Sequence, residues 1–181
     1  MTERKSAKRG VLLSRKIRTR ENGEQTIELA KSQIQRICDE LEVDDTTAKV
    51  AEAIYRRSLK RKFIQNRTIG TVAAASVYSA CRVEKEIRSP DEVTEAATDF
   101  EDGISISKTS LQRVYSEMSD ALELRTGPID PKNIIPRFCN ELNRNQRTEK
   151  TAKKLIESLD EKYQSGKSPT SLAAASIYAA S

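Results

Sequence analysis

The sequence predicts an all-α protein built from two copies of one helical unit. Charged residues make up 33% of the 181 residues and aromatic residues only 4%, with 6 Gly and 5 Pro. This composition favours helices over a sandwich of sheets. The second observation is a repeat, because VAAASVYSAC at Val72–Cys81 returns as LAAASIYAAS at Leu172–Ser181. The third is that apolar residues recur every three or four positions in most segments, as on one face of a helix.

Two further matches extend the repeat. RICDEL at 36–41 corresponds to RFCNEL at 137–142, and TAK at 47–49 corresponds to TAK at 151–153. The matches keep their order, and short loop insertions account for offsets that vary between about 100 and 104 residues. A basic residue before the Ala-rich segment is also common to both copies, as Arg67 in the first and Lys167 in the second.

The first unit contains five predicted helices. The segment VDDTT, between the first two, offers Asp45, Thr46 or Thr47 as the N-cap of the second helix. Ser89 is expected to cap the fourth helix, and Ser107 to start the fifth after a turn around Asp102-Gly103. The apolar stripes of the first, second and fifth helices consist of Ile27, Ala30, Ile34, Ile37, Cys38 and Leu41; of Val50, Ala51, Ile54, Tyr55 and Leu59; and of Leu111, Val114, Tyr115, Met118 and Leu122.

The third predicted helix, Thr68–Glu86, is apolar almost all the way round. A helix without a polar face is buried on all sides, and Ala and Ser side chains let neighbouring helices approach closely. We therefore expect this helix to be the centre of a bundle. Ser168–Ala180 repeats it, so we expect it to be the most buried helix of a second bundle.

The second unit contains three predicted helices, over Ile135–Leu142, Thr148–Tyr163 and Ser168–Ala180. Compared with the first unit it is incomplete, because helices four and five have no counterpart before Ser181. A central helix without two of its neighbours exposes apolar surface. This pattern favours either a fragment or truncated gene, or a second chain that covers the exposed face.

The predicted domains are a basic, flexible arm over residues 1–23, a first repeat over 24–124, a linker over 125–131 and a second repeat over 132–181. The net charge is +5, and Met1–Arg20 holds eight basic residues and one acid, so the remainder is slightly acidic. Such an arm is usually a solvated tail. It can also bind a polyanion, because neutralising phosphates releases counterions.

The residue types argue against several classes of site. There is no His, and the three cysteines, Cys38, Cys81 and Cys139, form no CxxC pair. Structural zinc needs four Cys or His ligands, so we expect no metal and no other cofactor, and interpret the cysteines as small apolar fillers on helix faces. No cluster indicates catalysis, so we expect neither an enzyme nor a small-molecule substrate. No apolar run reaches the roughly 20 residues that span a bilayer, which predicts an intracellular protein without a membrane partner.

The segment RRSLKRKFIQNR at Arg56–Arg67 carries six basic residues and no acid. It ends the second predicted helix and leads into the third. Cations at a helix C-terminus complement the helix dipole, which explains part of this pattern. The same side chains can instead form a ridge that contacts phosphates. The candidate DNA contacts in this segment are Lys60, Arg61, Lys62 and Arg67.

The fourth and fifth helices of the first unit are separated by a short turn and resemble a helix-turn-helix. The second helix of such a pair presents its N-terminal residues to nucleic acid. The fourth helix is acidic and is expected to point away from phosphate. An ordinary capped surface helix is the alternative explanation. The N-terminal residues of the fifth helix that carry this prediction are Ser107, Lys108, Thr109, Gln112 and Arg113.

Two five-helix repeats with Ala-rich third helices resemble the cyclin-like fold, and several segments resemble archaeal transcription factor B, the relative of eukaryotic transcription factor IIB. IYRRSLKRKFIQNRTIGTVAAASVYSACR at 54–82 is similar to the first repeat of that family. DPKNIIPRFCNEL and SGKSPTSLAAASIYAAS are similar to the second repeat, and LSRKIRTRENGEQTIELA at 13–30 to the segment before the first. The resemblance covers about residues 13–181.

The resemblance implies a general transcription initiation factor, associated with the nucleoid in the cytoplasm of an archaeal cell. Members of the family bind TATA-binding protein seated on a bent promoter, contact DNA on both sides of the TATA box, and recruit RNA polymerase through a zinc ribbon. By this resemblance Arg67 and Lys167 contact DNA, and Lys108 and Arg113 face TATA-binding protein and the adjacent DNA backbone, with Gln112 beside them.

This chain departs from the family in two ways. It has no CxxC pairs, so the zinc ribbon is missing, and the last two helices of the second repeat are missing too. Recognition of the element upstream of TATA is therefore expected to be weak, and recruitment of polymerase by this chain unaided is expected to fail. Two other functions stay open: a truncated paralogue that competes for TATA-binding protein, and a cyclin-type adaptor that docks another protein without touching DNA. The basic segments argue against the second of these.

Overall fold

The structure is a computed structural model that describes residues 23–98 and 106–181. All regular elements in these residues are helices, and no strand occurs among them, which confirms the predicted all-α class. The chain divides into two compact units, with the boundary between Thr126 and Gly127. The first 22 residues, which contain most of the predicted arm, lie outside the described residues, and so do Phe100 and the predicted turn at Asp102-Gly103.

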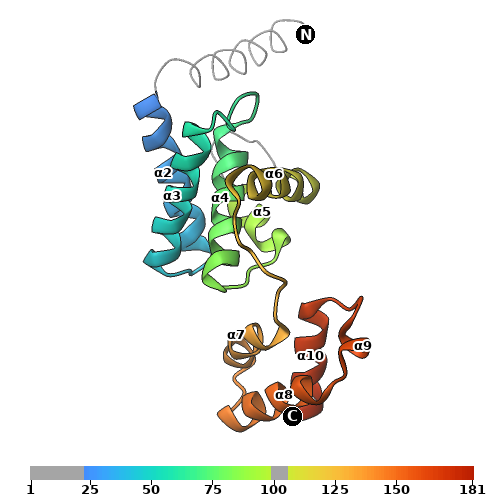
Figure 1. The fold of residues 1–181 in the computed structure, drawn as a ribbon. Coiled ribbons are helices and arrows are strands. Elements are labelled where there is room, and N and C mark those ends of the chain that lie inside the picture. Colours follow the sequence, from blue (N-terminus) through green and yellow to red (C-terminus); the bar gives the residue numbers. More distant parts are fainter. Residues whose placement is uncertain (1–22, 99–105) are drawn as a thin grey trace, which may run out of the picture. The chain divides into compact units, whose positions relative to one another are not determined.

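The described residues of unit 1 form a bundle of five helices with one helix at its centre (Figure 1). The central helix, α4, contacts each of the four others. Every residue from Val72 to Cys81 is buried, as the absence of a polar face predicts. The helices are α2 (Gly23–Glu40), α3 (Asp45–Lys60), α4 (Ile69–Glu84), α5 (Pro90–Thr98) and α6 (Lys108–Leu122).

The helix starts of unit 1 follow from short capping side chains. Ser89 accepts a hydrogen bond from the Glu92 amide at 3.1 Å while the Glu92 carboxylate accepts one from the Ser89 amide at 2.7 Å, which is a capping box. Ser107 accepts one from the Ser110 amide. These two predicted caps are confirmed. The predicted N-cap of α3 is wrong by one residue, because Asp44 holds the extended cap position and Asp45 is already helical.

Two serines lie inside the apolar centre of unit 1. The Ser76 and Ser79 hydroxyls donate to the carbonyls of Val72 and Ala75, one turn earlier, at 2.8 and 2.7 Å. Both hydroxyls are therefore satisfied within α4, and both also approach the Met118 sulfur of α6. Small side chains that satisfy their own polar groups let α6 pack closely on α4.

Unit 2 contains a short 3-10 helix followed by α-helices. The elements are η1 (Pro131–Asn133), α7 (Ile135–Glu141), α8 (Gln146–Ser158), α9 (Glu161–Gln164) and α10 (Pro169–Ala180). The predicted single helix Thr148–Tyr163 is wrong at both ends. Asn145 accepts a hydrogen bond from the Thr148 amide and so starts α8 earlier, and Leu159 adopts an extended backbone that separates α8 from α9.

The two Ala-rich helices share a sequence but not an environment. α10 packs on α7, α8 and η1 and buries Ala173, Ser176 and Ile177. Tyr178 is 86% exposed, whereas its counterpart Tyr78 in α4 is 6% exposed. Ala174 and Ala175 are exposed as well. The expectation that this helix exposes apolar surface is confirmed, because the described residues of unit 2 place helices against one face only.

The structure also corrects the register of the repeat. The N-caps of α3 and α8, Asp44 and Asn145, lie 101 positions apart. At that offset buried Thr47 pairs with buried Thr148, and buried Tyr55 with buried Ile156. The match between TAK at 47–49 and TAK at 151–153 is therefore not structural, since it would align Thr47 with the exposed Thr151.

Candidate nucleic-acid interface

Arg67 is held in a defined position just before α4. Its guanidinium lies over the Phe63 ring, 4.0 Å from the ring centroid, and donates to the Phe63 carbonyl. It also forms an ion pair with Glu117 of α6, with 2.5 Å between Nη2 and Oε2. The Arg67 side chain is 27% exposed, so part of it still faces solvent. Its orientation is fixed by contacts that span 50 residues of sequence.

Glu117 joins two of the predicted interface residues. While Oε2 contacts Arg67, Oε1 lies 4.0 Å from Nε of Arg113, one turn earlier in α6. A carboxylate between two guanidinium groups lowers the net positive charge that this surface offers to a phosphate. The structure thus brings Arg67 and Arg113 together, with a competing anion between them. Sequence reasoning missed Glu117, although its spacing of four residues from Arg113 was a visible signal.

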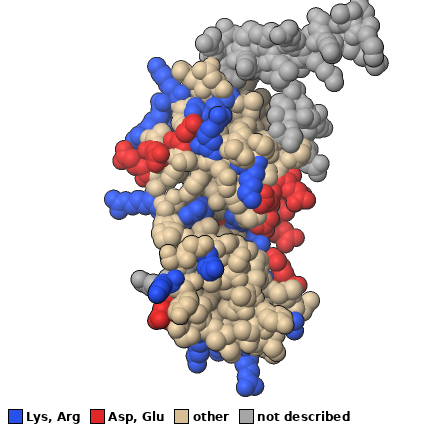
Figure 2. Space-filling model, turned by 90° about the vertical axis from the view of Figure 1, so that its right-hand side faces the viewer, with Lys and Arg blue, Asp and Glu red and all other residues tan. Residues whose placement is uncertain are grey.

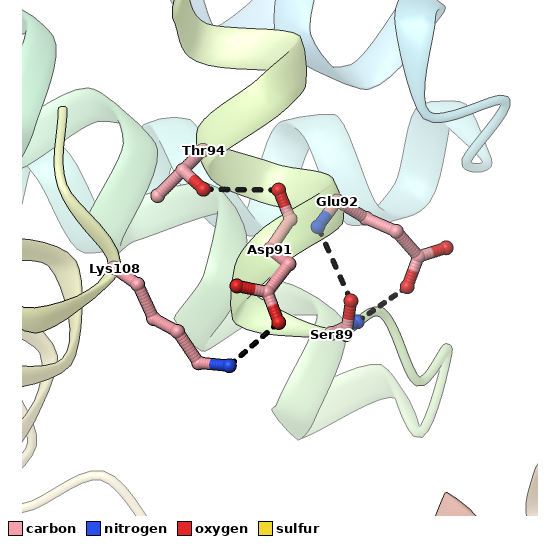
Figure 3. A network of polar contacts seen from close by, with 5 residues as sticks. All are labelled: Ser89, Asp91, Glu92, Thr94 and Lys108. Atoms are coloured by element: carbon pink, nitrogen blue, oxygen red, sulfur yellow. Dashed lines mark hydrogen bonds and ion pairs between the residues drawn. The ribbon is translucent and has the colours of Figure 1, made fainter. Parts of the chain in front are cut away.

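Lys108 also has an intramolecular carboxylate partner (Figure 3). Its Nζ lies 2.6 Å from Oδ2 of Asp91, which belongs to the first turn of α5. Figure 3 shows Asp91 beside the capping box of Ser89 and Glu92, with the Thr94 hydroxyl on the Asp91 carbonyl oxygen. The ion pair joins α5 to α6 across the segment that the structure leaves undescribed. Both side chains are half exposed or more, so solvent screens the pair and its energy is small.

Two arginines of the basic segment complete the end of another helix. Arg57 donates to the Leu122 carbonyl at 2.7 Å, and Arg61 donates to the Ala121 carbonyl. These are among the last carbonyls of α6, which have no partner inside the helix. Arg61 also lies 3.8 Å from Glu123. The guanidinium groups therefore contribute to the packing of α3 against α6, a role that the sequence pattern did not reveal.

The other candidate cations are exposed. Lys60, Lys62 and Lys167 form no ion pair with another described residue. Lys62 has a left-handed backbone with φ of 56° in the loop after α3. Lys167 lies directly before Ser168, the N-cap of α10, as Arg67 lies before Thr68, the N-cap of α4. Gln112 is exposed on α6, four residues after Lys108.

The charge on unit 1 is mixed. Figure 2 shows basic and acidic side chains interspersed on the viewed face of that unit. Among the candidate residues, the ion pairs are Arg61–Glu123, Arg67–Glu117 and Lys108–Asp91. A phosphate that binds one of these cations would have to displace its carboxylate partner, each of which is partly solvated.

The chain was compared with known proteins. A family model described as "Transcription factor TFIIB repeat" matches residues 23–121 and 124–181. The chain belongs to the TFIIB repeat family. The two matched segments divide within three residues of the boundary between the two compact units. The repeat in the sequence thus corresponds to two matches of one family unit.

Relatives come from several archaea. The chain is 40% identical over 167 residues to "Transcription initiation factor IIB 7" of Halobacterium salinarum, covering 92% of this chain and 50% of the relative. It is 33% identical over 168 residues to "Transcription initiation factor IIB" of Methanothermococcus thermolithotrophicus, covering 92% and 48%. It is 32% identical over 166 residues to "Transcription initiation factor IIB 2" of Haloferax volcanii, covering 91% and 48%. The chain thus spans about half the length of these TFIIB relatives.

The cysteines are buried and unpaired in this TFIIB-repeat chain, as predicted for apolar fillers. Burial raises the pKa of the Cys38 and Cys81 thiols from 9.0 to about 12, because a thiolate is poorly solvated inside the protein. Among residues 23–98 and 106–181, no three His, Cys, Asp or Glu side chains are grouped so that they could hold a metal ion. Of the helices in these ranges, none combines the length and apolarity needed to cross a membrane.

Proposed function

We propose that this chain acts in transcription initiation as an adaptor and not as an enzyme. It binds TATA-binding protein on promoter DNA, stabilises that complex, and helps to recruit RNA polymerase. The names of the relatives, all transcription initiation factors IIB, support the general role. The presence of both TFIIB repeats in one chain supports a protein that contacts its partners with two similar units.

The observation that carries the DNA part of this proposal is the position of Arg67. At the start of the central helix of unit 1, the Phe63 ring orients the Arg67 guanidinium, while Glu117 pairs with it and competes with a phosphate. A guanidinium that is already oriented loses little side-chain entropy when it binds a phosphate. Lys167 has the equivalent place in unit 2. In the proposal, each unit directs one such cation to the DNA backbone, while Lys108, Gln112 and Arg113 on α6 face TATA-binding protein.

A gel-shift experiment tests the proposal. Labelled TATA-box DNA is mixed with purified TATA-binding protein, with this chain, and with both. We expect a slower complex that requires both proteins and is lost when the TATA sequence is scrambled. If the chain binds TATA-binding protein only off DNA, it is a protein-docking adaptor and the proposal is wrong. Competition with a full-length relative in transcription separates the activating role from that of a competitor.

A further inference from the structure

Helix α8 of unit 2 carries a row of basic side chains that lies outside the candidate interface described above. Arg147, Lys150 and Lys154 are all exposed. With 3.6 residues per turn, they lie within about 60° of one another around the helix. The buried residues Thr148, Ala152 and Ile156 lie on the opposite side. We call Arg147, Lys150 and Lys154 the α8 basic row.

We propose that the α8 basic row is a second binding surface for duplex DNA, which contacts the phosphate backbone without reading bases. The proposal does not depend on TATA-binding protein. The row extends over eight residues, which is about 10 Å of helix. Each strand of B-DNA carries one negative charge per about 3.4 Å of the axis, so 10 Å of one strand offers about three phosphates, one for each cation.

The cations of the row are not neutralised by neighbouring acids. α8 contains two acidic residues, and each has another partner: Glu149 lies 2.6 Å from Lys153, and Glu157 lies 3.6 Å from Lys132. No ion pair joins Arg147, Lys150 or Lys154 to another described residue. This distinguishes the row from Arg61, Arg67 and Lys108 of unit 1, each of which has a carboxylate partner.

Helix stability does not explain the placement of the row. Arg147 lies in the first turn of α8, after the N-cap Asn145. The positive end of the helix dipole disfavours a cation there. By contrast, Arg57 and Lys60 lie in the last turn of α3, where the dipole favours them. The helix dipole therefore does not account for Arg147, and a bound phosphate would offset this unfavourable interaction.

The chemistry around the row favours nucleic acid over a protein partner. Arg147, Lys150 and Lys154 line a shallow surface pocket of about 450 Å³ together with Gln146 and Thr151. The Gln146 amide can donate a hydrogen bond there, whereas the Thr151 hydroxyl donates to the Arg147 carbonyl and must rotate to donate to a phosphate. None of these five is aromatic or aliphatic, whereas the centre of a protein–protein interface is rich in aromatic residues and poor in Lys. Phosphate oxygens accept from Arg, Lys, Thr and Gln alike.

The equivalent face of unit 1 provides an internal comparison. At the structural offset of 101 residues, Arg147, Lys150 and Lys154 correspond to Thr46, Lys49 and Ala53. All three are exposed, and only Lys49 is charged. The same helical surface therefore has one cation in unit 1 and three in unit 2, so the row is a property of unit 2 and not of the fold.

The test measures binding of the whole chain to a duplex without a TATA box, by fluorescence anisotropy, in the absence of TATA-binding protein and over a range of salt concentrations. The test variant replaces Arg147, Lys150 and Lys154 with Gln. The control variant replaces Lys31, Lys49 and Lys85, three exposed lysines of unit 1, with Gln. Both variants lose the same net charge, and circular dichroism verifies that both stay folded.

We expect the test variant to flatten the slope of log affinity against log salt by up to about 2.7, because each phosphate contact contributes about 0.9. The control variant should leave the slope almost unchanged. Equal effects of the two variants mean that only net charge matters, and they overturn the proposal. An unchanged slope in the test variant also overturns it and leaves an acidic protein as the candidate partner. The single variants Lys150→Gln and Lys49→Gln repeat the comparison at equivalent positions. Because TATA-binding protein is absent, failure here is distinct from failure of the gel shift.

Discussion

Tyr78 and Tyr178 offer a matched pair of substitutions at equivalent positions of the two repeats. Tyr78 is 6% exposed and meets the Tyr115 ring edge-on at 4.8 Å between centroids. Tyr178 is 86% exposed. Replacing each with Ala removes the same atoms from the same local sequence. Any difference in stability then reports only on what surrounds the side chain.

The expected effects differ by several kcal/mol. Truncating a large buried aromatic side chain to Ala costs about 3–5 kcal/mol, because it loses burial and leaves a cavity. The edge-to-face contact with Tyr115 accounts for about 0.5–1.5 kcal/mol of this. Tyr78→Ala should therefore destabilise unit 1 by about 3–5 kcal/mol, which lowers the midpoint of a unit of this size by roughly 12 °C or more. Tyr178→Ala should change the free energy of unfolding by less than about 0.5 kcal/mol.

Hydrogen exchange read by mass spectrometry is the suitable assay, because it reports α4 and α10 separately in a chain with two units. Peptides from α4 should lose protection in Tyr78→Ala, while those from α10 should keep wild-type protection in Tyr178→Ala. If Tyr178→Ala destabilises α10 as strongly as Tyr78→Ala destabilises α4, the exposed face of α10 is covered in solution. The reasoning from the described neighbours of α10 would then be refuted.

Three further predictions concern the candidate interface and the core. Glu117→Gln frees Arg67 and Arg113 and should tighten the complex with TATA-binding protein and DNA by roughly 1.4- to 5-fold, the range of a solvent-exposed ion pair. The matched control Glu123→Gln should have less effect. Weaker binding of Glu117→Gln would mean that Glu117 positions Arg67 for DNA. The pKa of the Cys38 and Cys81 thiols is about 12 in the folded chain, against an ordinary value of 9.0. Between these two values the folded state keeps protons that the unfolded state loses. The free energy of unfolding, measured in urea, should therefore fall as pH rises from about 9 towards 12. Both thiols should resist iodoacetamide at pH 8 until the chain is unfolded, and rapid modification of the native chain would contradict their burial.

The features that the sequence predicts well are those that depend on near neighbours. α4 has no polar face, so its burial follows from composition alone. The caps at Ser89 and Ser107 depend on residues three positions away. The spacing of cysteines on apolar stripes likewise predicts their burial.

The features that the sequence does not predict depend on distant residues. α4 and α10 have nearly the same sequence, yet α10 exposes Tyr178, because burial depends on which helices pack alongside; the shortened second repeat predicts this exposure, but the helix's own sequence does not. The hydrogen bonds from Arg57 and Arg61 to the end of α6 join residues at least 60 positions apart. A basic segment looks like a phosphate-binding ridge until such contacts are known. In α8, the cap at Asn145 and not the TAK match sets the register.

A salt titration of the complex between this chain, TATA-binding protein and TATA-box DNA decides whether Arg67 binds the DNA backbone. The affinity is measured for the wild-type chain, for Arg67→Ala and for the exposed control Lys49→Ala. Our account predicts that Arg67→Ala weakens binding and flattens the log–log slope by about 0.9, the contribution of one phosphate contact, while Lys49→Ala leaves the slope unchanged. A slope that is the same in Arg67→Ala and the wild-type chain would show that Arg67 serves only to join Phe63 and Glu117 within unit 1.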